Sequence, residues 1–438
     1  MVSRSALYAA QQQFLDTPTR EKGQFLIDAV NESFATMMAW QERDLTQQAI
    51  AEFVASQTRH WSAEGRLNAI YPNGDKVPKR DIPDFTEAFA TWVWRYYTQT
   101  GDRTLLARAY PALQKIADYI WSYRDGTTGL ITNLAGGSEK YLYGIIDWPE
   151  VERRGYDAAT TAHTSVNALA VEFLRATAAT AGALSRPAPE IAGHTSRADQ
   201  LTTSINASLR RSDGIYIDGS TGTTLSTHAS QLANSYALAF GLVPAASRAA
   251  VADYIAAMGM NQGPMTAHWL MKALADNERF DSLLMILTDK GRPGWANILS
   301  QGATFTWESW DAPVRGESES HGWGAQVVVD ILESLLGVRV ITPGAGTVGI
   351  RPPKTGLTFA RGTVHTQRGP VAADWSRGLT GLTLKIDVPM NVQAQVALPA
   401  ADVSATTAMG AGAPHYRESG GGWVIYDVGS GVSTFTTQ

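Results

Sequence analysis

The sequence predicts a large helical domain followed by a smaller β-sandwich, and two patterns along the chain indicate this. From the N-terminus to about Leu336, apolar residues recur at i, i+3, i+4 and i+7, as in TLLARAYPALQKIADYIWSY. From Val338 onward, short β-branched runs alternate with Gly, Pro and Ser turn residues. We therefore expect two domains, residues 1–337 and residues 338–438.

The helical part is too rich in helices for a simple bundle. We expect about a dozen helices, the first of them at MVSRSALYAA, without alternating strands. Polar loops join these helices, for example at 71–84 and 122–140. So many helices in one unit favour an α/α toroid or a solenoid.

The C-terminal part shows the pattern of an all-β domain. Its candidate strands are TVGIRP, LTGLTLKIDVP, VQAQVALPA, WVIYDV and VSTFTT. Their spacing predicts an antiparallel sandwich of roughly 100 residues.

Composition excludes several classes of function. The chain has 438 residues and a net charge of −5, with no basic block that would follow a nucleic-acid backbone. No apolar run approaches the roughly 20 residues of a membrane helix, so neither nucleic acid nor membrane is an expected partner. The absence of Cys excludes disulfides and thiolate catalysis. The N-terminus lacks the apolar core of a signal peptide, and the compartment, cytoplasmic or other, stays open.

Two loops combine acidic and aromatic side chains in an unusual way. DTPTREKGQFLIDA occupies residues 16–29, and GATFTWESWD at 302–311 places Glu308 between Trp307 and Trp310. Aromatic faces and carboxylates are what a sugar-binding subsite requires. Two carboxyl groups on opposite walls of a funnel can cleave a glycosidic bond, one as acid and the other as base or nucleophile.

Simpler structural explanations exist for both loops. An Asp, Arg and Glu group before a helix also forms a capping and salt-bridge cluster, and TWESW also suits a half-buried packing turn. Asp28 is equally suited to act as the N-cap of a helix that begins AVNESF.

The two loops resemble the signatures of bacterial α-L-rhamnosidases. DTPTREKGQFLIDA is similar to their D-C-P-x-R-E-K-G motif before G-D-A, and GATFTWESW with SHGWG is similar to their second signature. The segments 350–375, NVQAQVALP and VIYDVGSG resemble their C-terminal β-sandwich. The resemblance implies an (α/α)6 toroid and an inverting glycoside hydrolase that releases terminal α-L-rhamnose from glycosides or polysaccharide side chains.

The resemblance also implies roles for individual residues. Glu21 becomes the general acid and Glu308 the general base. Because Arg20 adjoins the acid, we expect it to pair with Asp16 or with a substrate hydroxyl. The expected substrate-binding residues are Asp16, Arg20, Asp28, Asp84, Asp147, Trp148, Trp307, Trp310 and His321, of which Trp307 and Trp310 would stack on the sugar. Asp147 and Trp148 are equally compatible with a structural turn.

This sequence departs from the family pattern at three positions. Thr17 replaces a Cys, while Phe25 and Ile27 stand where the family usually has Trp and Gly. The last two changes put the identity of the sugar in doubt more than the mechanism. Since relatives commonly carry β-sandwich domains before the helical one, we expect this chain to be a fragment or a minimal version.

The remaining aromatic and His residues point to no further chemistry. Trp92 and Trp94 are expected in the helical core, and His163, His228 and His268, which lack metal-ligand spacing, are expected as core or surface residues. No phosphate loop or dinucleotide fingerprint is present, so we predict no cofactor and no metal.

Three hypotheses follow, all with a carbohydrate partner. The first is an inverting α-L-rhamnosidase. The second is a toroid hydrolase or lyase for another sugar, such as a uronic acid or another deoxysugar. The third is a glycan-binding protein without catalysis.

Overall fold

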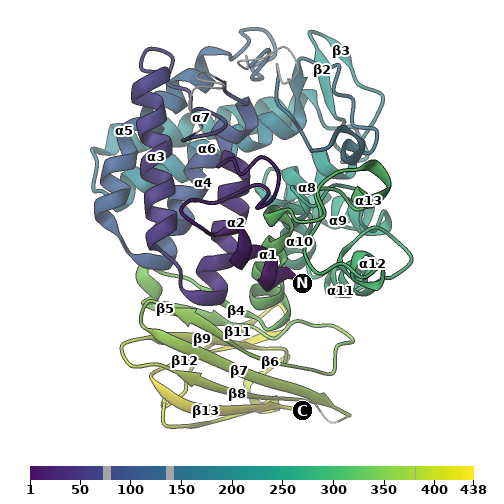
Figure 1. Ribbon diagram of the computed structural model, residues 1–438. Helices are drawn as coiled ribbons and strands as arrows, with labels where there is room; N and C mark the ends of the chain where they lie inside the picture. Colours follow the sequence, from purple (N-terminus) through teal and green to yellow (C-terminus); the bar gives the residue numbers. More distant parts are fainter. Residues whose placement is uncertain (73–79, 135–142, 380) are drawn as a thin grey trace. The chain divides into compact units, whose positions relative to one another are not determined.

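The chain divides into two compact units (Figure 1). The computed structural model describes residues 1–72, 80–134, 143–379 and 381–438, so the predicted loops at 71–84 and 122–140 lie partly outside the described residues. The first unit comprises residues 1–33, 44–94 and 103–326, and the second comprises 34–43, 95–102 and 327–438. The predicted domain boundary between residues 337 and 338 stays a prediction.

Helices dominate the first unit. They are α1 (Val2–Ala9), α2 (Leu26–Trp40), α3 (Asp44–His60), α4 (Pro83–Thr100), α5 (Arg103–Ser122), α6 (Thr164–Ala183), α7 (Ala188–Ser208), α8 (Gln231–Ala239), α9 (Arg248–Ala257), α10 (Ala267–Asp276), α11 (Phe280–Thr288), α12 (Trp295–Ser300) and α13 (Ala312–Arg315). The last residues of α2 and α4 belong to the second unit. Short strands β1 (Ala162–His163), β2 (Gly219–Thr221) and β3 (Thr224–Leu225) form a small sheet.

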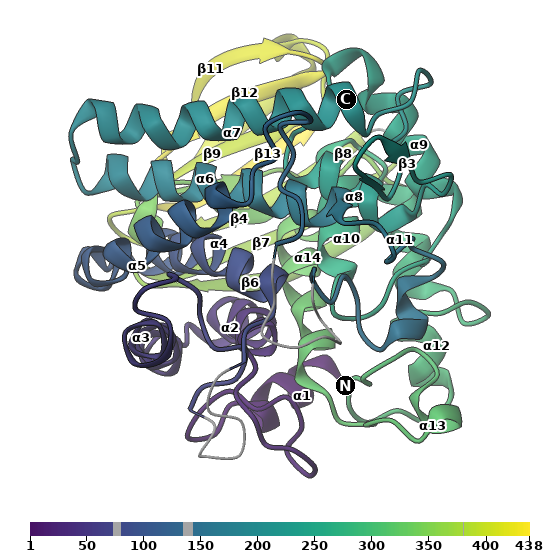
Figure 2. The same cartoon turned by 90° about the horizontal axis from the view of Figure 1, so that it is seen from above.

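Successive helices of the first unit alternate between full and one-sided burial. Helix α6 is buried on nearly every side, whereas α7 buries one stripe, His194, Ala198, Leu201 and Ile205. Helices α6 and α7 lie side by side (Figure 2). The same contrast separates α8 from α9 and α10 from α11. Inner helices paired with outer helices are the arrangement that a toroid requires.

The inner helix α6 is rich in small residues, which suits a helix with neighbours on several sides. Helix α6 contacts α5, α7 and α8, and its sequence is rich in Ala and Thr.

Among the described residues, no helix is both long and apolar enough to cross a lipid bilayer.

The second unit is built on two five-stranded sheets. One sheet has the order β10–β13–β8–β7–β6 and the other β11–β12–β9–β5–β4. The strands are β4 (Val338–Val340), β5 (Thr347–Ile350), β6 (Phe359–Thr366), β7 (Gly369–Gly378), β8 (Gly381–Val388), β9 (Gln393–Leu398), β10 (Thr406–Gly410), β11 (His415–Gly420), β12 (Trp423–Val428) and β13 (Gly431–Thr437). The unit also contains α14 (Val327–Asp330) before the first strand.

Alternating burial shows why these strands form a sandwich. In β8, Leu382, Leu384, Ile386 and Val388 are buried while the residues between them face outward. The two sheets meet where Tyr426 of β12 packs against Phe435 of β13, with ring centroids 5.7 Å apart. The prediction of a purely antiparallel sandwich is wrong at one pair, because β5 runs parallel to β9. A long connection through β6, β7 and β8 separates these two strands and permits the parallel pairing.

A close approach fixes the backbone beside two of the predicted site residues. Gly322 follows His321, and its N–H donates to the carbonyl of Asp16 at 3.3 Å. A Cβ at Gly322 would lie 1.8 Å from Oε1 of the buried Glu32 and 2.8 Å from Cβ of Ala9. Only Gly therefore allows these segments to meet.

We expect Gly322→Ala to lower the free energy of unfolding by about 1–3 kcal/mol, because the added methyl overpacks a filled space. Urea unfolding measures this loss. Gly193→Ala on α7 is the control, since its Cβ would meet nothing within 4 Å. Adding Glu32→Ala should restore part of the stability, and a double variant as unstable as Gly322→Ala alone would contradict the packing argument.

Candidate active site

The loop before α2 is folded around Asp16. One carboxylate oxygen of Asp16 accepts the N–H of Gly23 at 2.8 Å, and the other accepts the Thr17 hydroxyl at 3.3 Å. The same Thr17 oxygen accepts the N–H of Glu21 at 3.0 Å. Thr17, which replaces the family's Cys, therefore ties Asp16 to Glu21 through contacts that a thiol forms only weakly.

Glu308 is held by donors from three segments. Arg20 donates to both of its oxygens, with Nη1–Oε2 2.9 Å and Nη2–Oε1 3.1 Å. The indole N–H of Trp148 donates to Oε1 at 3.2 Å, and the N–H of Ser318 donates to Oε2 at 2.9 Å. Burial alone would raise the pKa of Glu308, but the hydrogen bonds from Arg20 and Ser318 lower it below its ordinary value. Glu308 is therefore ionised at neutral pH.

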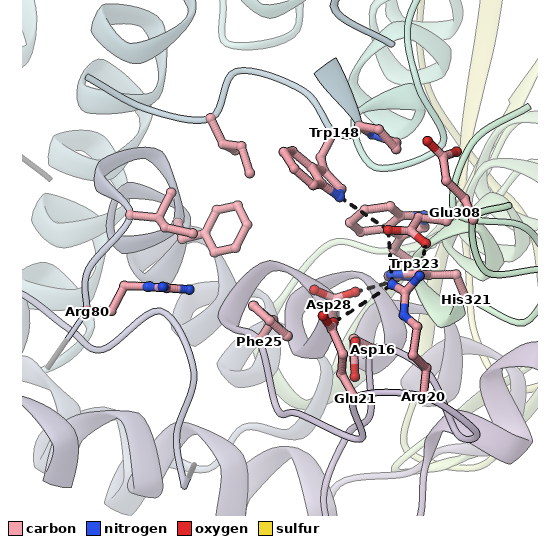
Figure 3. Close-up of a pocket in the computed structure, with 15 residues that line it drawn as sticks. Asp16, Arg20, Glu21, Phe25, Asp28, Arg80, Trp148, Glu308, His321 and Trp323 are labelled. Atoms are coloured by element: carbon pink, nitrogen blue, oxygen red, sulfur yellow. Dashed lines mark hydrogen bonds and ion pairs between the residues drawn. The ribbon is translucent and has the colours of Figure 1, made fainter. Parts of the chain in front are cut away.

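The expected pairing of Arg20 with Asp16 is wrong, because its guanidinium binds Glu308. A bidentate carboxylate satisfies the planar fork of Arg better than the inward-turned Asp16. Nη2 of Arg20 lies 3.8 Å from Oε2 of Glu21 and 3.1 Å from Oε1 of Glu308. Oε2 of Glu21 and Oε1 of Glu308 are therefore at most about 7 Å apart, because both lie at these distances from the same nitrogen. Figure 3 shows Arg20 between Glu21 and Glu308.

Asp28 faces His321 in the floor of the site. Helix α2 begins at Leu26, so Asp28 lies inside its first turn and is not the N-cap. Oδ1 of Asp28 is 3.4 Å from Nδ1 of His321. Burial, with Asp16 and Glu308 nearby, raises the pKa of Asp28 well above its usual range, while burial lowers the pKa of His321 to about 3. His321 is therefore neutral at pH 7, and burial favours the neutral form of Asp28.

Asp84 and Asp147 support the site from behind instead of lining it. Asp84 accepts the N–H groups of Ile145 and Ile146 at 3.1 and 2.8 Å. Asp147 accepts the N–H groups of Trp148 and Gly263 at 2.9 and 2.7 Å and the hydroxyl of Thr266 at 2.8 Å. Both carboxylates thus hold the loop that presents the Trp148 indole.

Trp307 and Trp310 do not occupy the positions expected for sugar stacking. Both are buried, and Trp310 packs on Trp295 at 5.0 Å and donates its indole N–H to the carbonyl of Gln262. Neither is among the described residues that line the cavity. Trp323 lines it instead and stacks on His321 at 3.8 Å. The sequence could have indicated Trp323 as a lining residue, because it lies in the motif SHGWG two residues after His321.

These residues enclose a single cavity of about 470 Å³. Its lining includes polar and aromatic side chains from segments far apart in the sequence. The lining residues are Asp16, Arg20, Glu21, Phe25, Asp28, Arg80, Ile82, Phe85, Ile145, Trp148, Pro149, Glu308, Glu317, His321 and Trp323. Besides Glu21 and Glu308, the cavity therefore brings together five of the predicted substrate-binding residues, namely Asp16, Arg20, Asp28, Trp148 and His321. Of the departures from the family pattern at residues 25 and 27, Phe25 lines the cavity and Ile27 does not.

The other singled-out residues have structural positions. Trp92 is wholly buried and donates its indole N–H to Ser33 at 2.7 Å. His163 and His268 are buried, and His228 pairs with Asp218 near the surface. Among the described residues, no group of three or more His, Asp or Glu side chains has the arrangement of a metal site.

Family comparison gives the class of the protein. Residues 1–332 match the bacterial alpha-L-rhamnosidase 6 hairpin glycosidase domain, and residues 337–411 match the bacterial alpha-L-rhamnosidase C-terminal domain. The paired helices and the cavity of the first unit are thus those of a six-hairpin glycosidase. Since the first match spans well over half of the sequence, the chain belongs to the bacterial α-L-rhamnosidase family. The predicted family and fold class are confirmed.

Individual relatives agree with this assignment. An α-L-rhamnosidase of Streptomyces avermitilis is 26% identical over 372 residues, which is 81% of this chain and 33% of the relative. One from Alteromonas sp. (strain LOR) is 25% identical over 326 residues, 70% of this chain and 33% of the relative. The chain spans about a third of the length of these relatives. The crystal structure of the Streptomyces avermitilis enzyme complexed with L-rhamnose has the same fold, with a TM-score of 0.80 and 21% identity, over 100% of this chain and 41% of that one.

We expect Arg20→Gln to destabilise the protein by about 1–3 kcal/mol at pH 7, because a buried carboxylate loses its charged partner. In the wild type the pKa of Glu308 is lowered, so the stability it contributes is present above its unfolded pKa and is lost as pH falls. The difference in the free energy of unfolding between the variant and the wild type should therefore shrink as the pH drops from 7 towards 3. Urea unfolding at several pH values measures it, with the exposed Arg108→Gln as control; a difference independent of pH would contradict this account.

Proposed function

We propose that this protein hydrolyses terminal α-L-rhamnosyl groups with inversion, using Glu21 as general acid and Glu308 as general base. The observation that carries the proposal is the placement of Glu21 and Glu308 on either side of the Arg20 guanidinium in one cavity. Family membership and the rhamnose complex of the Streptomyces avermitilis relative support the choice of sugar.

Glu308 has the properties that a general base needs. It is ionised, and only 6% of its side chain is exposed, so its charge acts in a water-poor environment. A water molecule beside it attacks the anomeric carbon while Glu308 takes one of the water's protons. Arg20 and Trp148 keep the carboxylate oriented during this step.

Glu21 is suited to donate the proton that the leaving group takes up. Its side chain is 54% exposed, which places the acid at the open side of the cavity, where a leaving group departs. Its proton moves to the glycosidic oxygen as the bond from that oxygen to the anomeric carbon breaks. The upper bound of about 7 Å between Oε2 of Glu21 and Oε1 of Glu308 is compatible with the lower end of the roughly 6.5–9.5 Å range of inverting enzymes and also with the roughly 5 Å of retaining ones. The predicted separation of roughly 6.5–9.5 Å stays a prediction.

The remaining lining groups suit a deoxysugar. Trp148 and Trp323 offer aromatic faces to C–H groups. The neutral His321, and Asp28, whose neutral form burial favours, offer hydrogen bonds to hydroxyls. These residues replace Trp307 and Trp310 in the proposed sugar contacts. The Arg20 guanidinium is already bound to both oxygens of the ionised Glu308, so it is not available to a uronate carboxylate in the same position, which disfavours the alternative of a uronate-specific enzyme.

Leaving-group dependence tests the two roles. Glu308→Gln should lower kcat by about 10²–10⁴-fold on every rhamnoside, because no base activates water. Glu21→Gln should lower it similarly on a rhamnosyl disaccharide but far less on p-nitrophenyl α-L-rhamnoside, whose phenol departs without full protonation. Asp199→Asn on the exposed face of α7 is the control. Equal losses on both substrates for Glu21→Gln would refute its role as acid.

The stereochemistry of the product tests inversion. NMR spectra taken during hydrolysis of an α-L-rhamnoside should show β-L-rhamnose first, followed by mutarotation. α-L-Rhamnose as the first product would show retention, and an unsaturated product would show a lyase. Absence of turnover on any rhamnoside would favour a sugar other than rhamnose or a binding protein.

A further inference from the structure

The cavity continues beyond the carboxylates to an end of different character. Asp16, Glu21, Asp28 and Glu308 gather near Arg20, whereas Arg80 enters from the opposite wall, on the side of Phe25 (Figure 3). The cavity volume of about 470 Å³ lies in the roughly 300–1,000 Å³ range of small-molecule binding sites. The Arg80 end is therefore available to the group attached to the sugar.

The two Arg side chains of the cavity differ in their pairing. Arg20 is engaged by both oxygens of Glu308. Within the described residues, the Arg80 side chain takes part in no ion pair or hydrogen bond, and it is only half-exposed. A guanidinium is always charged and presents five donors, so a partly buried one without a partner loses hydration that an anionic ligand would replace.

The surroundings of Arg80 define what that ligand must be. Its backbone is fixed, because the carbonyl of Arg80 accepts the N–H of Ala69 at 2.7 Å. The neighbouring Asp81 points elsewhere and contacts Arg66 at 3.4 Å. Phe25 lies on this side of the cavity (Figure 3), Phe85 is a further lining residue, and both offer aromatic rings to C–H groups. An apolar wall beside one free guanidinium suits a sugar ring that carries a carboxylate.

We propose that Arg80 binds the carboxylate of a uronic acid that is linked to the rhamnose and leaves with the aglycone. This inference rests on the proposed function, which places the leaving group on the open side of Glu21. The carboxylate belongs on the leaving sugar because the ionised Glu308 repels a negative charge at the other end of the cavity. Arg80 is thus a specificity-determining residue for acidic glycans.

Binding measured in a Glu21→Gln background tests the proposal, because this change slows turnover and leaves the Arg20–Glu308 pair intact. The probes are α-L-rhamnosyl-(1→4)-glucuronate and its methyl ester, which has the same shape without the charge. Calorimetry should give at least about tenfold tighter binding of the acid, equivalent to ~1.4 kcal/mol. Adding Arg80→Gln should bring the ratio close to one, whereas adding the exposed Arg108→Gln should preserve it.

The outcomes separate this inference from the proposed function. Equal affinity for acid and ester, a preference that survives Arg80→Gln, or no binding of the acid would each overturn the role of Arg80. Turnover of p-nitrophenyl α-L-rhamnoside by the wild type is measured independently. Turnover without a preference for the acid would retain the rhamnosidase and reject the acidic-glycan site. A sulfate monoester of a neutral rhamnosyl disaccharide that binds better than the uronate would also reject the carboxylate assignment.

Discussion

The ion pair between Arg20 and Glu308 connects the two loops on which the site depends. These loops are 288 residues apart in the sequence, yet two hydrogen bonds hold the side chains together. Without Arg20, burial would favour a neutral Glu308, and a neutral carboxyl group cannot accept a proton from water. Trp148 and Ser318 complete the arrangement from two further positions. One interaction therefore sets both the position and the charge of the proposed base.

The carboxyl groups around this ion pair differ in pKa because they accept hydrogen bonds from different donors. Glu308 is compensated for burial by four hydrogen bonds and stays ionised. Asp28 and Glu32 are buried close to other acids, which raises the pKa of each well above the usual range. Burial and a hydrogen bond with Glu21 raise the pKa of Asp16 to about 7. Burial and neighbouring acids thus favour the neutral forms of these carboxyl groups, whereas the donors around Glu308 favour its charged form.

The aromatic residues show how local sequence and site geometry can diverge. Trp307 and Trp310 flank Glu308 in the chain, but they face away from it into the core. Adjacent residues in an extended segment point to opposite sides, which directs Trp307 away from the cavity. Trp310 lies two residues after Glu308, and the chain bends and turns over residues 308–310, which redirects its side chain. The indoles that line the cavity come from Trp148, which is 160 residues away, and from Trp323 after His321.

The sequence by itself determined the helical and β-rich parts, the family motifs and the identity of Glu21, Glu308, Asp16, Asp28 and His321 as cavity residues. Periodicity and motif spacing are local properties, which is why they were readable without the structure. The tertiary structure decided which partner Arg20 takes, that Asp84 and Asp147 support a loop, that β5 runs parallel to β9, and that Arg80 enters the cavity. Each of these depends on contacts between distant segments, and burial and hydrogen bonding at such contacts are absent from any local pattern.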